Sequence, residues 1–248
     1  MSAFHTKRLR LDCFPKASPT CLSHSRLSLS WTMTQNPLLF KAHTHIRNVL
    51  KPGDSAVDAT AGNGHDALFL TECIQPGGKL WAVDIQAAAI EASRQRLASM
   101  GKLEGVTLIQ ANHADLLSLT PIAFHGKIRV IVFNLGYLPG GNKACITLPH
   151  STLSALSASL SLLAPGGLLS VMVYPGHKGG AAEAQVILDW LTTLDKRYTY
   201  RIYTSKMLNT QEDALPSLEF SSSHLLPTER PYLRLSAKPF WICLSKGS

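Results

Sequence analysis

Residues 54–66 (DSAVDATAGNGHD) combine carboxylates with two closely spaced glycines. The small and β-branched residues before Asp58 are typical of a buried parallel strand, which would end near that residue. Gly62 and Gly64 then allow a tight turn in which the backbone can pass close to a ligand. A helix that begins near His65 would point its free N–H groups at the same place. The stretch therefore predicts a binding site for a nucleotide-like ligand.

Two cofactors fit this glycine spacing. Gly62-x-Gly64-x-x-Ala67 matches the dinucleotide fingerprint, although a match of this kind is weakly specific on its own. Asp58 favours the other candidate, because a carboxylate beside the turn would repel a pyrophosphate but attract the sulfonium and ammonium groups of S-adenosylmethionine. The alternative without a ligand is a turn made by one aspartate and two glycines.

A second acidic residue, Asp84, ends the apolar run 79–84 and follows Gly64 by twenty residues. An acid at this spacing is expected to accept hydrogen bonds from ribose hydroxyls. Asp84 could also cap the next helix, and the two roles are compatible. The ends of two strands thus predict a nucleoside site.

Polar residues also follow the predicted third strand, Val106–Ile109. Asn112 or Asp115 could hydrogen-bond the exocyclic amine of an adenine ring at this edge of the sheet. His113 could face the same pocket, although a lone histidine is more often a structural residue.

Hydrophobic periodicity supplies the elements that position these residues. Helices are predicted at 36–50, 65–75, 86–100, 147–163 and 181–194, and strands at 56–58, 79–84, 106–109, 129–134, 168–174, 198–203 and 239–244. Five strand–helix units followed by two strands without a crossover helix predict an α/β fold: a seven-stranded, mainly parallel sheet with one antiparallel strand and helices on both faces. That arrangement is the class I methyltransferase variant of the Rossmann fold, with polar residues 206–237 as a surface loop.

Composition favours a folded enzyme with an anionic partner. The 248 residues are 45% hydrophobic and 16% charged, and the formal net charge of +8 puts nucleic acid first among partners, although many small-molecule enzymes are basic too. No apolar run approaches the ~20 residues that cross a bilayer. The five cysteines have no metal-ligand spacing, so we expect reduced thiols, no metal and no membrane.

Residues 1–32 differ from the rest of the chain, with five basic residues, six serines and a single acid, Asp12. This composition is typical of an organellar transit peptide, for a chloroplast or a mitochondrion. The alternative is that Met33 is the true start and the protein is cytoplasmic. In both cases we expect a disordered tail at 1–32 and a methyltransferase domain at 33–248.

Three stretches together resemble the MnmM (YtqB-like) family of class I methyltransferases: residues 58–66, 133–141 (FNLGYLPGG) and 174–180 (YPGHKGG). The likeness covers roughly residues 36–200, and the last two motifs are more specific than the glycine loop. It implies S-adenosylmethionine as cofactor and methylation of the aminomethyl group of 5-aminomethyl-2-thiouridine at the tRNA wobble position. Residues 206–237 look like an insertion, which leaves the tRNA contacts less defined than the chemistry.

The resemblance assigns the catalytic roles to the loops after the fourth and fifth strands. Asn134 would orient the amine, Tyr137 would stack on the uracil, and His177 would take a proton or contact a phosphate. Each has a plain alternative, respectively a turn residue, a core residue and a loop residue. Lys143 and Lys178 could hold tRNA phosphates near the anticodon.

The complete predicted cofactor site adds residues beside the glycine loop and after the second strand. Its members are Asp58, Thr60, Gly62, Asn63, Gly64, Asp66, Asp84, Ile85, Gln86, Asn112, His113 and Asn134. Three rival functions remain from the residues alone: methylation of rRNA or a small amine, an NAD-linked oxidoreductase, and a binding module without catalysis. The oligomeric state is open, and a homodimer is compatible with this hypothesis.

Overall fold

The computed structural model describes residues 36–138, 140–141, 145–205, 220–221 and 237–247. Its helices are α2 (Pro37–Val49), α3 (His65–Ile74), α4 (Ala87–Ser99), α5 (Leu116–Leu119), α6 (Pro149–Leu162) and α7 (Gly180–Leu191). Its strands are β1 (Ser55–Asp58), β2 (Lys79–Asp84), β3 (Val106–Gln110), β4 (Ile128–Asn134), β5 (Leu163–Val173), β6 (Tyr198–Thr204), β7 (Phe220–Ser221) and β8 (Phe240–Lys246). The predicted tail, Lys143 and most of the predicted surface loop lie outside the described residues.

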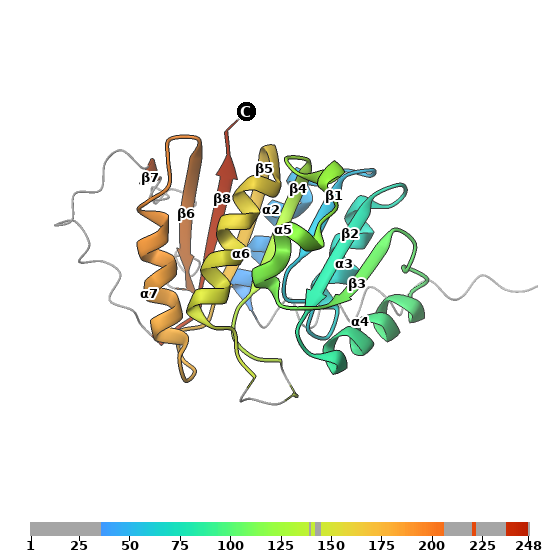
Figure 1. Cartoon of the computed structure of the whole chain (residues 1–248), viewed down its shortest axis with the longest axis horizontal. Coiled ribbons are helices and arrows are strands. Elements are labelled where there is room, and N and C mark those ends of the chain that lie inside the picture. Colours follow the sequence, from blue (N-terminus) through green and yellow to red (C-terminus); the bar gives the residue numbers. More distant parts are fainter. Residues whose placement is uncertain (1–35, 139, 142–144, 206–219, 222–236, 248) are drawn as a thin grey trace, which may run out of the picture. The chain divides into compact units, whose positions relative to one another are not determined.

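The strands form one sheet in the order β3-β2-β1-β4-β5-β8-β6-β7 (Figure 1). Strands β1 to β5 pair in parallel, and β8 enters between β5 and β6, antiparallel to both. The predicted seven strands with one reversed strand are confirmed. Because β1, β2 and β4 are parallel, their carboxyl ends lie along one edge of the sheet, at the bottom of Figure 1.

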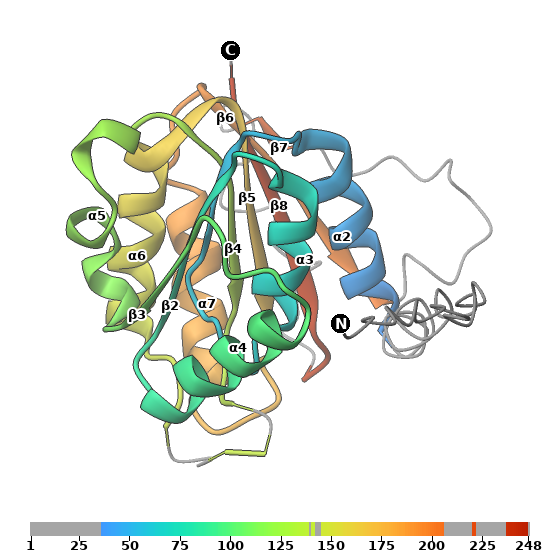
Figure 2. The ribbon, with the colours of Figure 1, turned by 90° about the vertical axis from the view of Figure 1, so that its right-hand side faces the viewer.

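Helices cover both faces of the sheet: α2, α3 and α4 pack on one face, and α5, α6 and α7 on the other (Figure 2). Neighbouring strand residues alternate between the two cores, with Ala56 and Leu80 on the α3 side and Val57 and Trp81 on the α6 side. This alternation follows from the two-residue repeat of a strand. Buried on both faces, the central strands are apolar almost throughout, as parallel strands are.

Two details differ from the sequence prediction. An eighth strand, β7, lies within the stretch predicted as a loop and pairs with the outer edge of β6, on the side away from β8. The predicted break at residues 165–167 lies inside β5, where the pairing register with β4 shifts between Ile128 and Val130. A β-bulge of this kind tolerates a proline, because the missing N–H falls where the ladder is interrupted.

The connection from β3 to β4 also differs from a full strand–helix unit. It holds only the short α5 and two 3-10 turns, His113–Asp115 and Ile122–Phe124. In the described ranges, no helix has the length and apolar character needed to cross a bilayer.

Candidate functional site

The glycine loop between β1 and α3 has the tight geometry that the sequence predicts. Gly62 and Gly64 have φ angles of 52° and 77°, in the left-handed region that favours glycine. A Cβ on Gly64 would come within 2.7 Å of the Ser93 Cα in α4. The second glycine therefore serves close packing of α4 as well as the turn itself.

Asp84 at the end of β2 holds this loop. One of its carboxylate oxygens accepts from the Gly62 N–H at 2.9 Å, and the other accepts from the Gln86 N–H at 2.9 Å. Each carboxylate oxygen has a further lone pair, so the group can also accept from ribose hydroxyls. Ile85, the next residue, is 56% exposed and presents an apolar surface beside this carboxylate.

Asp58 at the end of β1 is fully buried. One oxygen accepts from the Thr60 N–H at 3.2 Å, whereas Oδ2 has no partner. Burial raises the pKa of this carboxyl well above its usual range, and the nearby Asp66 and Asp84 carboxylates raise it further. A buried carboxyl group with an unpaired oxygen and two further carboxylates in its surroundings fits a ligand that carries positive charge.

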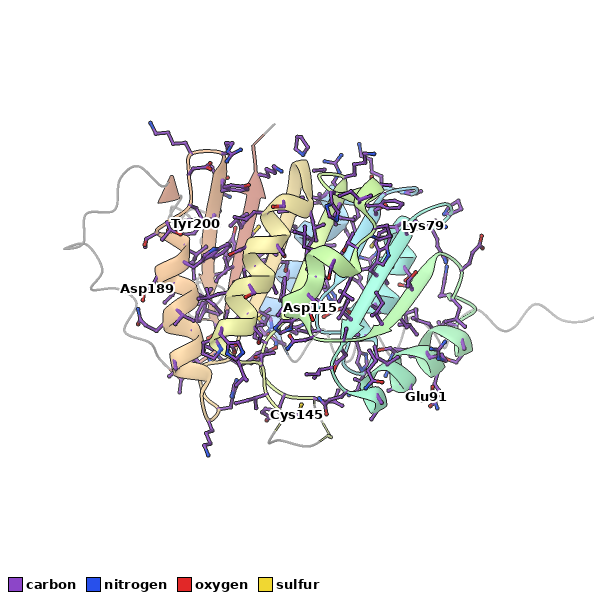
Figure 3. All side chains as sticks on the ribbon, in the orientation of Figure 1. Lys79, Glu91, Asp115, Cys145, Asp189 and Tyr200 are labelled. Atoms are coloured by element: carbon purple, nitrogen blue, oxygen red, sulfur yellow. The ribbon has the colours of Figure 1, made fainter. Side chains whose placement is uncertain are left out.

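The residues after β3 form the next wall. The Asn112 side chain accepts from the Ala114 N–H at 2.9 Å and caps the 3-10 turn, and Asp115 is exposed (Figure 3). His113 packs edge-on against Phe133, with ring centroids 6.0 Å apart, and its buried Nε2 has no partner. Burial lowers the pKa of His113, which keeps the imidazole neutral near pH 7. This uncharged ring with an unpaired nitrogen can still make one hydrogen bond to a ligand.

Asn134 at the end of β4 contacts both the glycine loop and α3. Its backbone N–H donates to the Thr60 Oγ1 at 2.7 Å, and its amide Nδ2 donates to Asp66 Oδ2. The other oxygen of Asp66 lies 2.8 Å from His43 Nε2. The amide oxygen of Asn134 takes no part in the contact with Asp66, so it can accept a hydrogen bond from another group.

His43 is a residue of this site that the sequence analysis missed. It lies in α2 and is 6% exposed, and its ring stacks on Phe69 with centroids 3.9 Å apart. In the sequence it sits beside the apolar residues Ala42 and Ile46 of a helical stripe. The only local signal was a histidine at a position where the pattern calls for an apolar side chain.

Tyr137 and His177 meet at the loops beyond β4 and β5. Their rings are perpendicular with centroids 6.0 Å apart, and Tyr137 is 41% exposed rather than part of the core. His177 Nδ1 lies 2.9 Å from the Lys178 carbonyl oxygen, and the buried Nε2 has no partner. Gly136 and Gly180 make room for this ring, since a Cβ on them would lie 3.3 and 2.9 Å from Nε2.

A buried carboxylate, also missed from the sequence, braces this loop. Glu183 of α7 is 1% exposed and accepts from the hydroxyls of Thr147 at 2.8 Å and Thr152 at 2.6 Å. Thr147 Oγ1 in turn accepts from the Gly136 N–H at 2.9 Å, and the Thr147 N–H donates to the Gly136 carbonyl at 2.8 Å. Glu183 therefore fixes the backbone next to Tyr137 through a threonine.

Figures 1 and 3 locate these groups on the molecule. The loops after β1, β2, β4 and β5 all leave the lower edge of the sheet, where Cys145 is labelled, and Lys79 at the start of β2 lies at the opposite edge. Within the described part of the chain, no three His, Cys, Asp or Glu side chains gather as a metal site.

A reversed strand between β5 and β6, a glycine loop after β1 and an acid at the end of β2 define a class I, S-adenosylmethionine-dependent methyltransferase. The family model described as "Putative rRNA methylase" matches residues 80–218, and that of the ubiE/COQ5 methyltransferase family matches residues 32–125. The chain belongs to the first of these families, whose model spans more than half of its length.

Named relatives agree with this assignment. The chain is 42% identical over 198 residues, covering 73% of this chain and 71% of the relative, to the "tRNA (mnm(5)s(2)U34)-methyltransferase, chloroplastic" of Arabidopsis thaliana. A "putative rRNA-methylase" structure from Clostridium thermocellum has a TM-score of 0.67 at 28% identity, covering 84% of this chain and 97% of that one. A methyltransferase structure from Streptococcus mutans "in complex with SAH" has a TM-score of 0.63, with the same identity and coverage.

The residues of the site fit S-adenosylmethionine. The unpaired buried oxygen of Asp58 suits a cationic group, and Asp84 retains acceptor capacity for ribose hydroxyls. The exposed Ile85 side chain suits the flat face of a purine. A side chain at Gly64 would require α4 to move, because its Cβ would lie 2.7 Å from the Ser93 Cα.

Proposed function

We propose that this enzyme methylates the aminomethyl nitrogen of 5-aminomethyl-2-thiouridine at the tRNA wobble position and that it binds the anticodon region of the tRNA. The observation that carries the proposal is the position of Asn134, at the carboxyl end of β4 between Thr60 of the glycine loop and Asp66. The Arabidopsis relative, whose name specifies a tRNA substrate, supports the same substrate class.

An amine nucleophile needs hydrogen-bond acceptors that orient it, as well as a group that takes up its proton. Its pKa is near that of lysine, about 10, so most of it is protonated at neutral pH and it must lose a proton before it attacks. The Asn134 amide oxygen can accept from the amine and aim its lone pair. S-Adenosylmethionine supplies the methyl group: the N–C bond forms as the C–S bond breaks, the electron pair stays on sulfur, and one proton leaves the nitrogen.

The other loop residues suit a nucleotide substrate. Tyr137 presents a partly exposed ring on which a uracil could stack. His177 packs edge-on against that ring, and the exposed Lys178 next to it could contact a phosphate. The hydrogen bonds from Glu183 through Thr147 to Gly136 hold the backbone next to Tyr137, which favours a fixed position for its ring.

rRNA is a second candidate substrate, because the family model that matches the chain carries that description. The two candidates differ in which RNA gains a methyl group. We expect the purified enzyme to transfer methyl groups to tRNA that carries 5-aminomethyl-2-thiouridine, and nucleoside mass spectrometry to detect the methylated base. Transfer to ribosomal RNA, with tRNA that carries 5-aminomethyl-2-thiouridine left unmethylated, would replace the proposed substrate. Tight NADH binding without methyl transfer would exclude methyltransferase activity.

We further propose that residues 1–32 direct import into an organelle. Their basic, serine-rich composition and the word chloroplastic in the name of the Arabidopsis relative support the proposal. A fluorescent reporter that carries residues 1–32 is expected to enter chloroplasts or mitochondria, whereas a reporter fused behind residues 33–64 should stay in the cytosol. Cytosolic fluorescence from both reporters would instead favour a start at Met33.

A further inference from the structure

We propose that Asp66 accepts the proton that the amine nucleophile loses, and that His43 is the positioning residue that holds Asp66 for this task. The inference rests on the proposed function, because it concerns the proton of the same amine. It assigns a role in proton transfer to an aspartate that the sequence assigned to the cofactor, and a role to a histidine in a helix that carries none of the family's motifs.

The geometry brings Asp66 to the reacting nitrogen through Asn134. Nδ2 of Asn134 donates to Asp66 Oδ2, so the amide oxygen of Asn134 lies on the same planar group as the nitrogen that contacts the carboxylate. An amine that donates to this oxygen from the side of Nδ2 would therefore lie next to Asp66 Oδ2. That carboxylate oxygen has a second lone pair, which can take the proton.

His43 fixes the orientation of the carboxylate. Its Nε2 lies 2.8 Å from Asp66 Oδ1, and stacking on Phe69 holds the plane of its ring. The His43 side chain is 8% exposed and that of Asp66 is 15% exposed, so the pair is largely screened from water but the carboxylate keeps a path to solvent. Buried Nδ1 of His43 has no partner, which fits a neutral ring that donates from Nε2 alone.

The chemistry requires an acceptor of this kind. An ammonium group and S-adenosylmethionine react to give a methylated ammonium group, S-adenosylhomocysteine and one proton, so charge balances only if that proton is taken up. Asn134 cannot take it, because an amide is not a base at neutral pH. Asp66 can hold the proton until the product leaves and then release it to water through its exposed edge.

Other ionisable groups are less suitable. Asp58 is fully buried behind the glycine loop, and Asp84 already holds two backbone N–H groups of that loop. Glu183 is 1% exposed, and each of its oxygens already accepts from a threonine hydroxyl. His177 faces Gly136 and Gly180, two glycines whose tight packing leaves its Nε2 enclosed.

Several charged or titratable groups face the pair from neighbouring elements. Asp58 from β1 and His65 from the start of α3 lie close enough to Asp66 for mutual electrostatic effects, and so does Tyr174 after β5. Arg47 of α2 lies over the Phe69 ring, 4.9 Å from its centroid.

Asp66→Asn is the central test, because the amide is nearly isosteric and can still accept from Asn134. We expect kcat for tRNA methylation to fall by about a hundredfold at pH 7, the usual range for loss of a proton acceptor. The defect should shrink as the pH approaches about 10, where the amine is already deprotonated in solution. Asp189→Asn makes the same change at an exposed position of α7, and its kcat should match that of the parent at each pH.

Cofactor binding gives a readout that does not depend on the RNA. Calorimetry should find S-adenosylmethionine affinity little changed in Asp66→Asn. Loss of that affinity would return Asp66 to the cofactor site and overturn the proposal, as would a rate defect that stays constant from pH 7 to 10. A parent enzyme that does not methylate the tRNA overturns the proposed function, and this assignment with it, before any variant is compared.

His43 variants separate positioning from packing. His43→Gln keeps an N–H donor for Asp66 and should retain much of the parent kcat, whereas His43→Ala should lose kcat with little change in cofactor affinity. The same kcat in the two variants, whether at the parent value or reduced by the same factor, would show that the hydrogen bond to Asp66 is not what His43 contributes. Melting temperatures of the two variants control for the lost stacking on Phe69.

Discussion

Asp84→Ala is expected to weaken S-adenosylmethionine binding by about ten- to a hundredfold, because hydrogen bonds to a charged group contribute about 1.5–3 kcal/mol. The change removes the acceptor predicted for the ribose hydroxyls. It also frees the N–H groups of Gly62 and Gln86, each of which now donates to this carboxylate at 2.9 Å. Calorimetric titration with the cofactor measures the effect directly.

Two further variants serve as controls for the effect of Asp84→Ala on cofactor affinity. Asp84→Asn keeps one oxygen acceptor and can still hold one of the two backbone N–H groups, so its affinity should fall between those of the parent and of Asp84→Ala. Asp189→Ala removes a carboxylate at an exposed position of α7 and should bind S-adenosylmethionine with the affinity of the parent. Parent-like affinity in a folded Asp84→Ala variant would exclude the ribose assignment.

The parts of this site that follow locally from strand ends could be predicted from the sequence. An apolar run that ends in an acid, followed by glycines, reports where a parallel strand stops and where its loop turns. Parallel pairing then brings Asp58, Asp84 and Asn134 to one edge without further information. Each of these residues stands where the sequence placed it, at the carboxyl end of its strand.

The contacts between distant segments could not be predicted in this way. His43 and Asp66 are 23 residues apart, and Asp66 and Asn134 are 68 residues apart. Their contact depends on how α2 and α3 pack on the sheet, which periodicity alone does not specify. The Glu183 brace was missed for the same reason, because its threonine partners lie on the other side of β5 in the sequence.

Irregular strands were missed for a different physical reason. The two residues of β7 are too few to show an alternating pattern, and they pair only because β6 offers an open edge. Pro165 and the glycines after it are ordinary signals for a break, yet β5 continues through them because a register shift absorbs the missing N–H. Local signals mark such positions as irregular without deciding whether the strand stops or bulges.

Asn134→Ala is expected to lower the rate of methyl transfer by at least about tenfold, roughly 1.4 kcal/mol of barrier. The variant loses the amide oxygen that orients the amine and the Nδ2–H that holds Asp66. Both contacts act on the nucleophile, so the loss should appear in kcat far more than in cofactor affinity. That division is the signature of an interaction made mainly in the transition state.

Comparison with Tyr137→Ala tests whether the effect belongs to orientation. If the Tyr137 ring stacks on the uracil, its removal should raise KM for tRNA as well as lower kcat, whereas Asn134→Ala should leave KM for tRNA near that of the parent. Methyl incorporation into tRNA that bears 5-aminomethyl-2-thiouridine, measured over a range of tRNA concentrations, separates the two patterns. A parent-like rate in Asn134→Ala would mean that the nucleophile binds elsewhere, because the variant keeps the backbone N–H that donates to Thr60 and loses the side chain that contacts Asp66.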